Sequence, residues 1–351
     1  MIETNCSLKL FNSFAIDAKA QQLFRLQTRT QFPDLLLQIK SAQQQNQPIL
    51  ILGGGSNVLF CEDFAGLIIK VELLGIEIVA SENSYQLQVG AGEDWHQLVT
   101  DCVEKGIDGL ENLALIPGVV GAAPVQNIGA YGTEFKDFCT SVEYIDLNSG
   151  ELHTLTREQC LFGYRDSIFK TPAFKNALIT QVTMSLTKQW QPQSRYGGLS
   201  SLNQHEQLTA KKIYDSVCQV RSEKLPDPTV LGNAGSFFKN PLVKQNVANA
   251  LLALYPDMPN FPQPAGVVKL AAGWLIDQAN LKGKQIGGAA VHQQQALVLV
   301  NKGDATAMDV VKLAEFVRDT VQQRFNVELE HEVRFIGAFG ETNLSEVLAH
   351  V

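Results

Sequence analysis

Positive charge is in short supply in this chain. Its 351 residues include 28 Lys and Arg against 36 Asp and Glu, which gives a formal net charge of −8. A broad nucleic-acid surface needs clustered positive charge to displace counterions. The composition therefore argues against a nucleic-acid-binding protein. It leaves room for a local basic pocket that binds a phosphorylated small molecule.

Metal-binding and redox motifs are also missing. The six cysteines are widely scattered and form no CxxC pair, so neither a zinc knuckle nor a dithiol redox motif is indicated. The histidines form no HExxH or triad pattern, and no carboxylate–histidine cluster has metal spacing. We therefore expect no metal ion. The thiols are typical of a reduced, cytoplasmic protein.

The start of the chain has an early acid and no long apolar core, which excludes a signal peptide. Residues 112–133 carry no charge and are long enough to cross a bilayer. This segment also holds Pro117, Pro124 and four glycines, so it could not satisfy its own backbone groups in lipid. It predicts buried loops and short strands with many free backbone amides, and no membrane association.

The length predicts more than one subdomain, because a single core stops growing near ~250–300 residues. Hydrophobic content of 45% and charged content of 18% fit a soluble globular protein. The best domain boundary is Lys224–Pro228, since a residue before proline is pushed to extended geometry. Hydrophobic periodicity predicts helices over 34–45, 95–103, 213–224, 247–255, 268–280 and 310–321. It predicts strands over 47–52, 66–79, 84–92, 289–292, 296–300 and 327–337, and a hairpin over 142–155.

Two glycine-rich stretches stand out. In LILGGGSNVLF, residues 50–60, successive backbone amides could form a nest for phosphate. Val58 takes the place of the third glycine of a Rossmann fingerprint, and no helix pattern follows; taken alone, this stretch favours a tight hairpin turn. IPGVVGAAPVQNIGAYG, residues 116–132, would let a flat ligand lie close to the chain, or is a buried structural loop. The two together favour a large ligand with phosphate and ring parts.

Three more stretches carry candidate chemistry. FGYRDSIFK, residues 162–170, places Arg165 among aromatic and aliphatic side chains, where its fork of donors suits a carboxylate. LGNAGSFFKNP, residues 231–241, holds Ser236 between glycines and two phenylalanines, as a core hydroxyl or a chemical group. Glu332 lies on the polar side of the alternating stretch 327–337 and could simply face water.

The ordered set of motifs resembles one family. The motifs occur along the chain in this order: GGGSN, PGVVGAAPVQNIGAYG, FGYRDSIFK, KLPDP, GNAGSFFKNP, AAGWLIDQANLKGKQIGGAAVHQQQALVLVN and the closing EVRFIG. Together they resemble the UDP-N-acetylenolpyruvoylglucosamine reductases, flavoenzymes of peptidoglycan precursor synthesis. The resemblance covers nearly the whole chain, from about residue 12 to the final strand. Each motif alone is weak, and the ordered set is very specific.

The resemblance implies an α+β protein with the FAD-binding fold of the vanillyl-alcohol oxidase type: two FAD subdomains and a third, α+β substrate domain. The implied domains are 1–77, to which 327–351 returns, then 78–225, and the substrate domain 226–326. It also implies a monomer. The alternatives are a small-alcohol flavin oxidase or dehydrogenase of the same fold and a nucleotide-sugar binding protein without chemistry. Many such oxidases tether flavin through His or Cys; neither glycine-rich segment contains one, so FAD is expected to be non-covalent.

The resemblance also implies a reaction. NADPH would reduce FAD, and the reduced FAD would give a hydride to the enolpyruvyl group of the nucleotide sugar. Arg165 would bind the substrate carboxylate, Ser236 would deliver the proton, and Glu332 would polarise the carboxylate or hold Arg165 and water in place.

The other implied contacts are with cofactor and substrate. The expected FAD ligands are Gly53, Gly54, Gly55, Ser56, Asn57, Gly118, Gly121, Ala122, Gln126, Asn127, Gly129, Arg221 and Arg334. The expected substrate ligands are Tyr196, Lys224, Asn240, Lys282 and Gln295. Tyr196 matches the tyrosine-bearing loop of one family subtype, although Gly198 stands where a polar residue is expected. Ala15 likewise replaces a common glycine.

Overall fold

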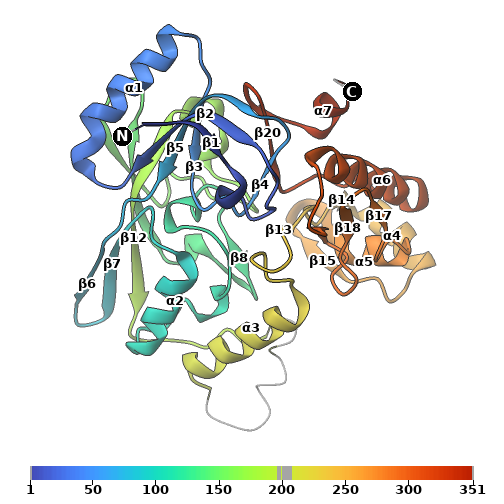
Figure 1. The fold of residues 1–351 in the computed structure, drawn as a ribbon. Helices are drawn as coiled ribbons and strands as arrows, with labels where there is room; N and C mark the ends of the chain where they lie inside the picture. Colours follow the sequence, from blue (N-terminus) through green and yellow to red (C-terminus); the bar gives the residue numbers. More distant parts are fainter. Residues whose placement is uncertain (1, 196–198, 200–207, 350–351) are drawn as a thin grey trace. The chain divides into compact units, whose positions relative to one another are not determined.

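The computed structural model describes residues 2–195, 199 and 208–349 (Figure 1). The chain forms two compact units. Unit 1 comprises Met1–Thr4, Gln22–Gly54 and Gly66–Glu223, and unit 2 comprises Asn5–Gln21, Gly55–Ala65 and Lys224–Val351. The chain therefore passes between the units several times. The finer division into 1–77, 78–225 and 226–326 stays a prediction.

Unit 1 is built on a five-stranded antiparallel sheet of order β11-β10-β12-β7-β6. Its strands are β6 (Ile76–Ala80), β7 (Ser84–Gly90), β10 (Cys139–Asp146), β11 (Leu152–Thr156) and β12 (Ala177–Thr187). β10 and β11 form the predicted hairpin. Helix α2 (Trp95–Glu104) buries Trp95, Leu98, Val99, Cys102 and Val103, the face that helical spacing predicted. Asp94 caps this helix by accepting a hydrogen bond from the backbone of Gln97 at 2.8 Å.

A second sheet has the order β1-β2-β5-β3. Its strands are β1 (Ile2–Ser7), β2 (Lys19–Leu26), β3 (Ile49–Leu52) and β5 (Phe64–Val71), and β3 runs parallel to β5. Helix α1 (Phe32–Gln44) buries its Leu35, Ile39 and Ala42 face and has Pro33 in its first turn. The tight hairpin turn over GGGSN is wrong. Strand β4 (Val58–Phe60) belongs to a different sheet, of order β21-β20-β4, so GGGSN joins two sheets.

Unit 2 surrounds a separate hydrophobic core. One sheet has the order β13-β19-β18-β17 and another the order β14-β16-β15. The strands are β13 (Asn233–Ser236), β14 (Leu242–Lys244), β15 (Asn260–Gln263), β16 (Val267–Leu270), β17 (Gln285–Ile286), β18 (Ala289–Val291), β19 (Val298–Asn301), β20 (Arg334–Gly337) and β21 (Gly340–Thr342). The helices are α4 (Gln245–Leu254), α5 (Ala272–Gln278), α6 (Ala307–Phe325) and α7 (Leu344–Ala349). Helix α3 (Ala210–Lys224) precedes them and ends at the predicted KLPDP stop.

Three predicted elements differ from expectation. The strand over 66–79 is wrong as a single element, because β5 and β6 divide it between two sheets. The helix over 268–280 is wrong at its start, because Val268 and its neighbours pair with β14 on one side and β15 on the other as strand β16. The strand over 327–337 begins only at Arg334. The preceding residues keep the alternation, with Val327, Leu329 and Val333 buried. They meet their neighbour through the isolated bridge between Phe238 and His331, not through a ladder.

The uncharged segment 112–133 is irregular, as predicted. A short 3₁₀ turn at Glu111–Leu113 overlaps its start, and a second lies at Val120–Ala122. The segment ends within a two-stranded ribbon formed by β8 (Gly129–Ala130) and β9 (Thr133–Glu134). Among the residues that the structure describes, none of the helices combines the length and the apolar character needed to cross a membrane.

Gly232 provides a test of packing in unit 2. A Cβ atom at this position would lie 2.5 Å from the carbonyl oxygen of Phe14. Because that neighbour is backbone, we expect Gly232→Ala to lower the free energy of unfolding by about 1–3 kcal/mol. Denaturant unfolding of the purified protein measures this change.

Gly273→Ala is the matched control, since the atoms nearest to its added Cβ would be side-chain atoms of Leu297 and Gln295, at 3.4 Å or more. It lies in helix α5, where alanine is the better helix former, so it should not destabilise the protein. Equal stability of Gly232→Ala and the unsubstituted chain would contradict the packing at Phe14.

Candidate active site

The two glycine-rich stretches touch each other in unit 1. A Cβ on Gly54 would lie 2.9 Å from the Cα of Gly118, and one on Gly53 would lie 2.9 Å from a methyl carbon of Val119. The backbones approach so closely that only glycine fits at position 54 without displacement of its neighbour. Gly118 also accepts a hydrogen bond from the backbone of Trp95 at 3.0 Å, which fixes this segment to helix α2.

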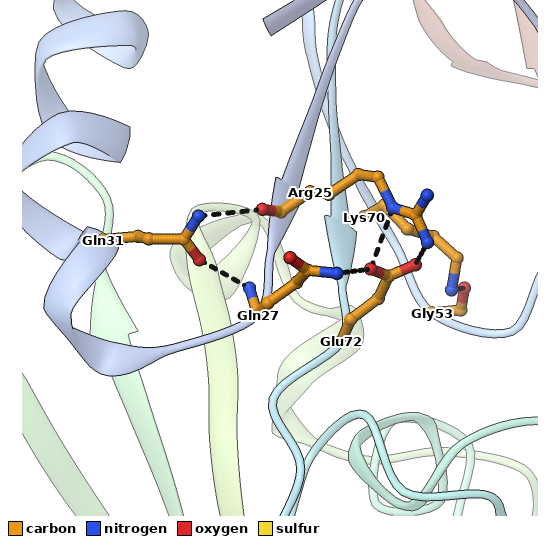
Figure 2. A network of polar contacts seen from close by, with 6 residues as sticks. All are labelled: Arg25, Gln27, Gln31, Gly53, Lys70 and Glu72. Atoms are coloured by element: carbon orange, nitrogen blue, oxygen red, sulfur yellow. Dashed lines mark hydrogen bonds and ion pairs between the residues drawn. The ribbon is translucent and has the colours of Figure 1, made fainter. Parts of the chain in front are cut away.

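A half-buried lysine holds the first glycine of this pair. Lys70 lies on β5 and donates from Nζ to the carbonyl oxygen of Gly53 at 2.7 Å (Figure 2). Burial lowers the pKa of Lys70, while the charge of Glu72 opposes that shift. Lys70 is therefore a supporting residue that the sequence analysis missed. Its only signal is a lone lysine within the apolar run GLIIKVELL.

Glu72 is itself held in a polar network (Figure 2). It receives two hydrogen bonds from the guanidinium of Arg25, at 2.9 and 2.8 Å, and one from the amide of Gln27 at 3.1 Å. Burial tends to raise the pKa of Glu72, but the hydrogen bonds and charge of Arg25 outweigh it, so the pKa is below its usual value. Glu72 therefore stays ionised beside Lys70, which helps Lys70 to remain charged next to Gly53.

Arg165 lies at a strained turn of unit 1. Gly163 and Asp166 are bridged across it, and Arg165 takes a φ of +53°. A left-handed conformation costs a residue other than glycine about 1–2 kcal/mol, and such strain gathers at functional sites. The Arg165 side chain is half-buried and donates from Nη2 to the carbonyl oxygen of Gly129 at 2.8 Å. The structure thus joins the arginine to the second glycine-rich segment, which sequence reasoning treated separately.

Arg221, on helix α3, presents a second guanidinium in unit 1. Its Nη2 donates to the carbonyl oxygen of Leu115 at 3.1 Å. Its Nε is buried and has no hydrogen-bond partner among the described residues. Burial chiefly lowers the pKa of Arg221, and the positive charge of Arg165 adds to that shift. An anionic ligand would offset the repulsion between the guanidinium groups of Arg165 and Arg221. It could also accept a hydrogen bond from the unpaired Nε of Arg221.

These features fit FAD. The unpaired Nε of Arg221 is a charged donor for an anionic group. The close contact of Gly54 with Gly118 brings the segment expected at the pyrophosphate next to the segment expected at the flavin ring. Unit 1 therefore offers both the charge and the backbone access that a dinucleotide cofactor requires.

Ser236 and Glu332 come from segments that pair in unit 2. The backbone N–H of Glu332 donates to the carbonyl oxygen of Phe237 at 2.8 Å, one residue beyond Ser236. Ser236 is exposed at the end of β13, whereas Phe237 and Phe238 are buried. Glu332 is half-buried, so the interpretation of a fully solvated face does not hold. The glycine before the serine has a φ of +71°, a conformation that suits glycine.

The GGGSN stretch reaches the same part of unit 2. Asn57 donates from Nδ2 to the carbonyl oxygen of Glu332 at 3.3 Å, and its own carbonyl oxygen accepts from the backbone of Arg334 at 3.1 Å. Gly55 has a φ of +67°, and a Cβ there would lie 1.9 Å from the carbonyl oxygen of Phe11. The Arg334 side chain forms two hydrogen bonds with the carboxylate of Glu341, at 3.1 and 2.8 Å.

Three expected substrate ligands gather around helix α5 in unit 2. Asn240 accepts a hydrogen bond from the backbone of Ala272, at the start of the helix, at 3.0 Å. The Gln295 side-chain oxygen lies 3.6 Å from the Cβ position of Gly273. Lys282 follows the helix and pairs with Asp277 at 3.0 Å. Lys224 is exposed at the end of α3.

The expected residues thus divide between the units, and Tyr196 lies outside the described residues. Unit 1 holds Gly53, Gly54, Gly118, Gly121, Ala122, Gln126, Asn127, Gly129, Arg165 and Arg221. Unit 2 holds Gly55, Ser56, Asn57, Lys224, Ser236, Asn240, Lys282, Gln295, Glu332 and Arg334. No group of three or more His, Cys, Asp or Glu suited to a metal ion occurs within 2–195, 199 and 208–349.

Comparison with known proteins begins with two family models. Residues 227–336 match the model of the C-terminal domain of UDP-N-acetylenolpyruvoylglucosamine reductase. Residues 33–156 match the model of an FAD binding domain. A crystal structure of UDP-N-acetylenolpyruvylglucosamine reductase from Thermus caldophilus is similar with a TM-score of 0.63 and 24% sequence identity. The match covers 95% of this chain and 98% of that one. These findings confirm the predicted α+β fold class with an FAD-binding domain.

Full-length relatives are far more similar in sequence. The UDP-N-acetylenolpyruvoylglucosamine reductase of Photobacterium profundum is 52% identical over 343 residues, which is 98% of this chain and 98% of the relative. That of Escherichia coli (strain K12) is 51% identical over 345 residues, which is 98% of this chain and 100% of the relative. The chain belongs to the UDP-N-acetylenolpyruvoylglucosamine reductase family.

Proposed function

We propose that this protein reduces the enolpyruvyl ether of UDP-N-acetylglucosamine to the lactyl ether, UDP-N-acetylmuramate, with NADPH as the source of electrons. The observation that carries the proposal is the backbone pairing of the Ser236 and Glu332 segments in unit 2. The pairing brings a hydroxyl and a carboxylate onto neighbouring stretches of chain. The family relationship over 98% of the chain supports the same activity and disfavours both a small-alcohol oxidase and a binding protein without chemistry.

The FAD would be held by residues of both glycine-rich stretches and by Arg221. FAD supplies the hydride of this reaction when it is bound. Successive backbone amides in the GGGSN stretch suit its pyrophosphate, and Lys70 steadies that stretch through Gly53. The Gly118–Gly129 segment would lie along the ring. The absence of His and Cys from both stretches leaves the cofactor non-covalently bound.

Arg165 would bind the substrate carboxylate. Its planar guanidinium can form two parallel hydrogen bonds with a carboxylate, and it stabilises the negative charge that develops there during reduction. The hydroxyl of Ser236 would give its proton to the carbon next to that carboxylate, and a weak acid suffices for so basic a carbon. Glu332 would polarise the carboxylate or orient Arg165 and water. Lys224, Asn240, Lys282, Gln295 and Tyr196 would hold the diphosphate and sugar.

A cytoplasmic location and a monomeric state complete the proposal. The described cysteines are all free thiols, which is typical of a reducing compartment. Size-exclusion chromatography with light scattering measures the oligomeric state directly.

Arg165→Lys tests the carboxylate ligand. Lysine keeps the charge but loses the two-pronged geometry, so reoxidation of reduced flavin by the enolpyruvyl nucleotide sugar should slow by about 10²-fold. FAD content should be normal. The exposed Arg157 provides the control Arg157→Lys, which should behave as the unsubstituted protein. Unchanged reoxidation in Arg165→Lys would remove Arg165 from the mechanism.

Lys282→Ala tests the diphosphate ligand. A charged hydrogen bond to phosphate strengthens binding, so calorimetry should show the affinity of the oxidised protein for the substrate falling about tenfold, which is about 1.4 kcal/mol. Added salt should also weaken binding to the unsubstituted protein. Lys284→Ala is the control, because the Lys284 ammonium lies 4.5 Å from the ring centroid of Phe316. If Lys282→Ala binds the substrate as tightly as Lys284→Ala and the unsubstituted protein do, Lys282 does not bind the substrate.

Ser236→Ala tests the proton donor. A positioned general acid contributes ~10²–10⁴-fold in rate, and alanine removes the proton with little volume. NADPH should reduce the flavin at a near-normal rate, while the nucleotide sugar should reoxidise it far more slowly. Stopped-flow absorbance follows both half-reactions on one sample. Ser345→Ala, at an exposed position of α7, is the control; equal slowing of both half-reactions in Ser236→Ala would instead indicate structural damage.

A further inference from the structure

The Asn127 side chain is fully buried in unit 1 and is bonded to protein through all three of its polar positions. Its Nδ2 donates to Oε2 of Glu134 at 3.0 Å and to the carbonyl oxygen of Gly163 at 2.9 Å. Its Oδ1 accepts from the backbone of Lys136 at 3.0 Å. An amide group has two N–H donors, so both are used within the protein. None is left for the flavin, although the sequence placed this residue among the FAD ligands.

Gly163 is the first residue of the turn that carries Arg165. Across this turn the backbone of Gly163 donates to Asp166 at 2.9 Å, while the return bond from Asp166 to the Gly163 carbonyl is stretched to 3.4 Å. Asn127 therefore supplies the shorter of the two hydrogen bonds that reach the Gly163 carbonyl. The orientation of the first peptide of the turn depends on this amide.

The other end of the same segment receives the arginine side chain. Gly129, two residues after Asn127, accepts from Arg165 Nη2 at 2.8 Å. Lys170 in turn donates from Nζ to the backbone carbonyl of Arg165 at 2.6 Å. The short stretch 127–129 thus bonds both the backbone of the turn and the guanidinium that the turn presents.

Both residues share an unusual backbone conformation. Asn127 has a φ of +43° and Arg165 a φ of +53°. Asparagine tolerates the left-handed region better than most residues, whereas arginine in that region persists only when the surroundings impose it. The hydrogen bonds from Asn127 and Lys170 are two of the constraints that hold this turn, beside the Gly163–Asp166 bridge and the bond from Arg165 to Gly129.

We propose that Asn127 is a positioning residue for Arg165. Its amide holds the Gly163–Asp166 turn so that the guanidinium is already oriented for the substrate carboxylate before the substrate binds. The inference rests on the proposed function of Arg165 and deepens it. It assigns Asn127 a role in the step that uses the nucleotide sugar and none in the reduction of the flavin.

Asn127→Asp is the first test. Aspartate keeps the size, the tolerance of positive φ and the acceptor for Lys136, but it replaces both donors with an oxygen that faces Glu134 and the Gly163 carbonyl. Displacement of a positioned group by about 1 Å can slow a reaction about 10²-fold. We expect reoxidation of the flavin by the enolpyruvyl nucleotide sugar to slow by about tenfold or more. Reduction by NADPH and the FAD content should stay near normal.

A binding measurement gives a second readout that does not depend on turnover. Calorimetry of the oxidised protein with the enolpyruvyl nucleotide sugar should show weaker affinity for Asn127→Asp, because the arginine is no longer held ready. Unchanged reoxidation together with unchanged affinity would overturn the proposal. If the unsubstituted protein itself is not reoxidised by this substrate, the proposed function fails first, and that outcome is distinct from a failure at Asn127 alone.

A double variant separates positioning from stability. In Asn127→Asp combined with Glu134→Gln, the glutamine amide can donate to the new carboxylate, which restores one bond with its direction reversed. The Gly163 carbonyl still lacks its amide donor. We expect the melting temperature, which Asn127→Asp alone should lower, to recover in the double variant. Reoxidation of the flavin by the nucleotide sugar should stay slow. Recovery of both together would show that Asn127 serves only the stability of the fold.

Asn301→Asp is the matched control in unit 2. The Asn301 amide is also buried, donates to the carbonyl oxygen of Phe14 at 3.0 Å and accepts from Gly303 and Ala305. The same substitution should lower the melting temperature without selectively slowing reoxidation. A selective loss of reoxidation of equal size in Asn301→Asp would also overturn the assignment, because it would not depend on contact with the Arg165 turn.

Discussion

The backbone hydrogen bond from Glu332 to Phe237 organises the candidate catalytic groups of unit 2. It joins the Ser236 strand to the segment that leads into β20, although almost a hundred residues of chain separate them. Burial of Phe237 and Phe238 holds the same pair of segments in place, so the exposed Ser236 is attached to a well-packed part of the chain. Asn57 then bonds to the carbonyl oxygen of Glu332, and this contact brings the end of the GGGSN stretch to the same place.

In unit 1, charged side chains are held in partly buried surroundings. The charge of nearby Glu72, which Arg25 holds in place, favours the charged form of Lys70, and Lys70 fixes Gly53 by a hydrogen bond. Arg165 is held at a strained turn by backbone and side-chain hydrogen bonds. In both places a charged group is expensive to bury unless it is paired or hydrogen-bonded, and the partners that satisfy it also set its direction.

Much of the secondary structure follows from local patterns, but some elements depended on distant partners. Helix α2 appears where helical spacing predicted it, since its buried face and its cap are encoded within a dozen residues. Val268 and its neighbours have an equally apolar pattern, yet they form a strand because β14 and β15 pair on both sides. The same limit applies to GGGSN, which looks like a hairpin turn until β3 and β4 are seen to join different sheets.

The family, the α+β class and the residue types of the site can be inferred from the amino-acid order alone, because an ordered set of motifs carries the chemistry that a ligand requires. Which polar groups of these side chains stay available to a ligand depends on the three-dimensional fold. The Asn127 amide is used within the protein, the Arg334 guanidinium bonds to Glu341, and Arg221 keeps an unpaired buried Nε. Hydrogen bonds of side chains depend on groups far along the chain, so no local pattern reveals which donors remain.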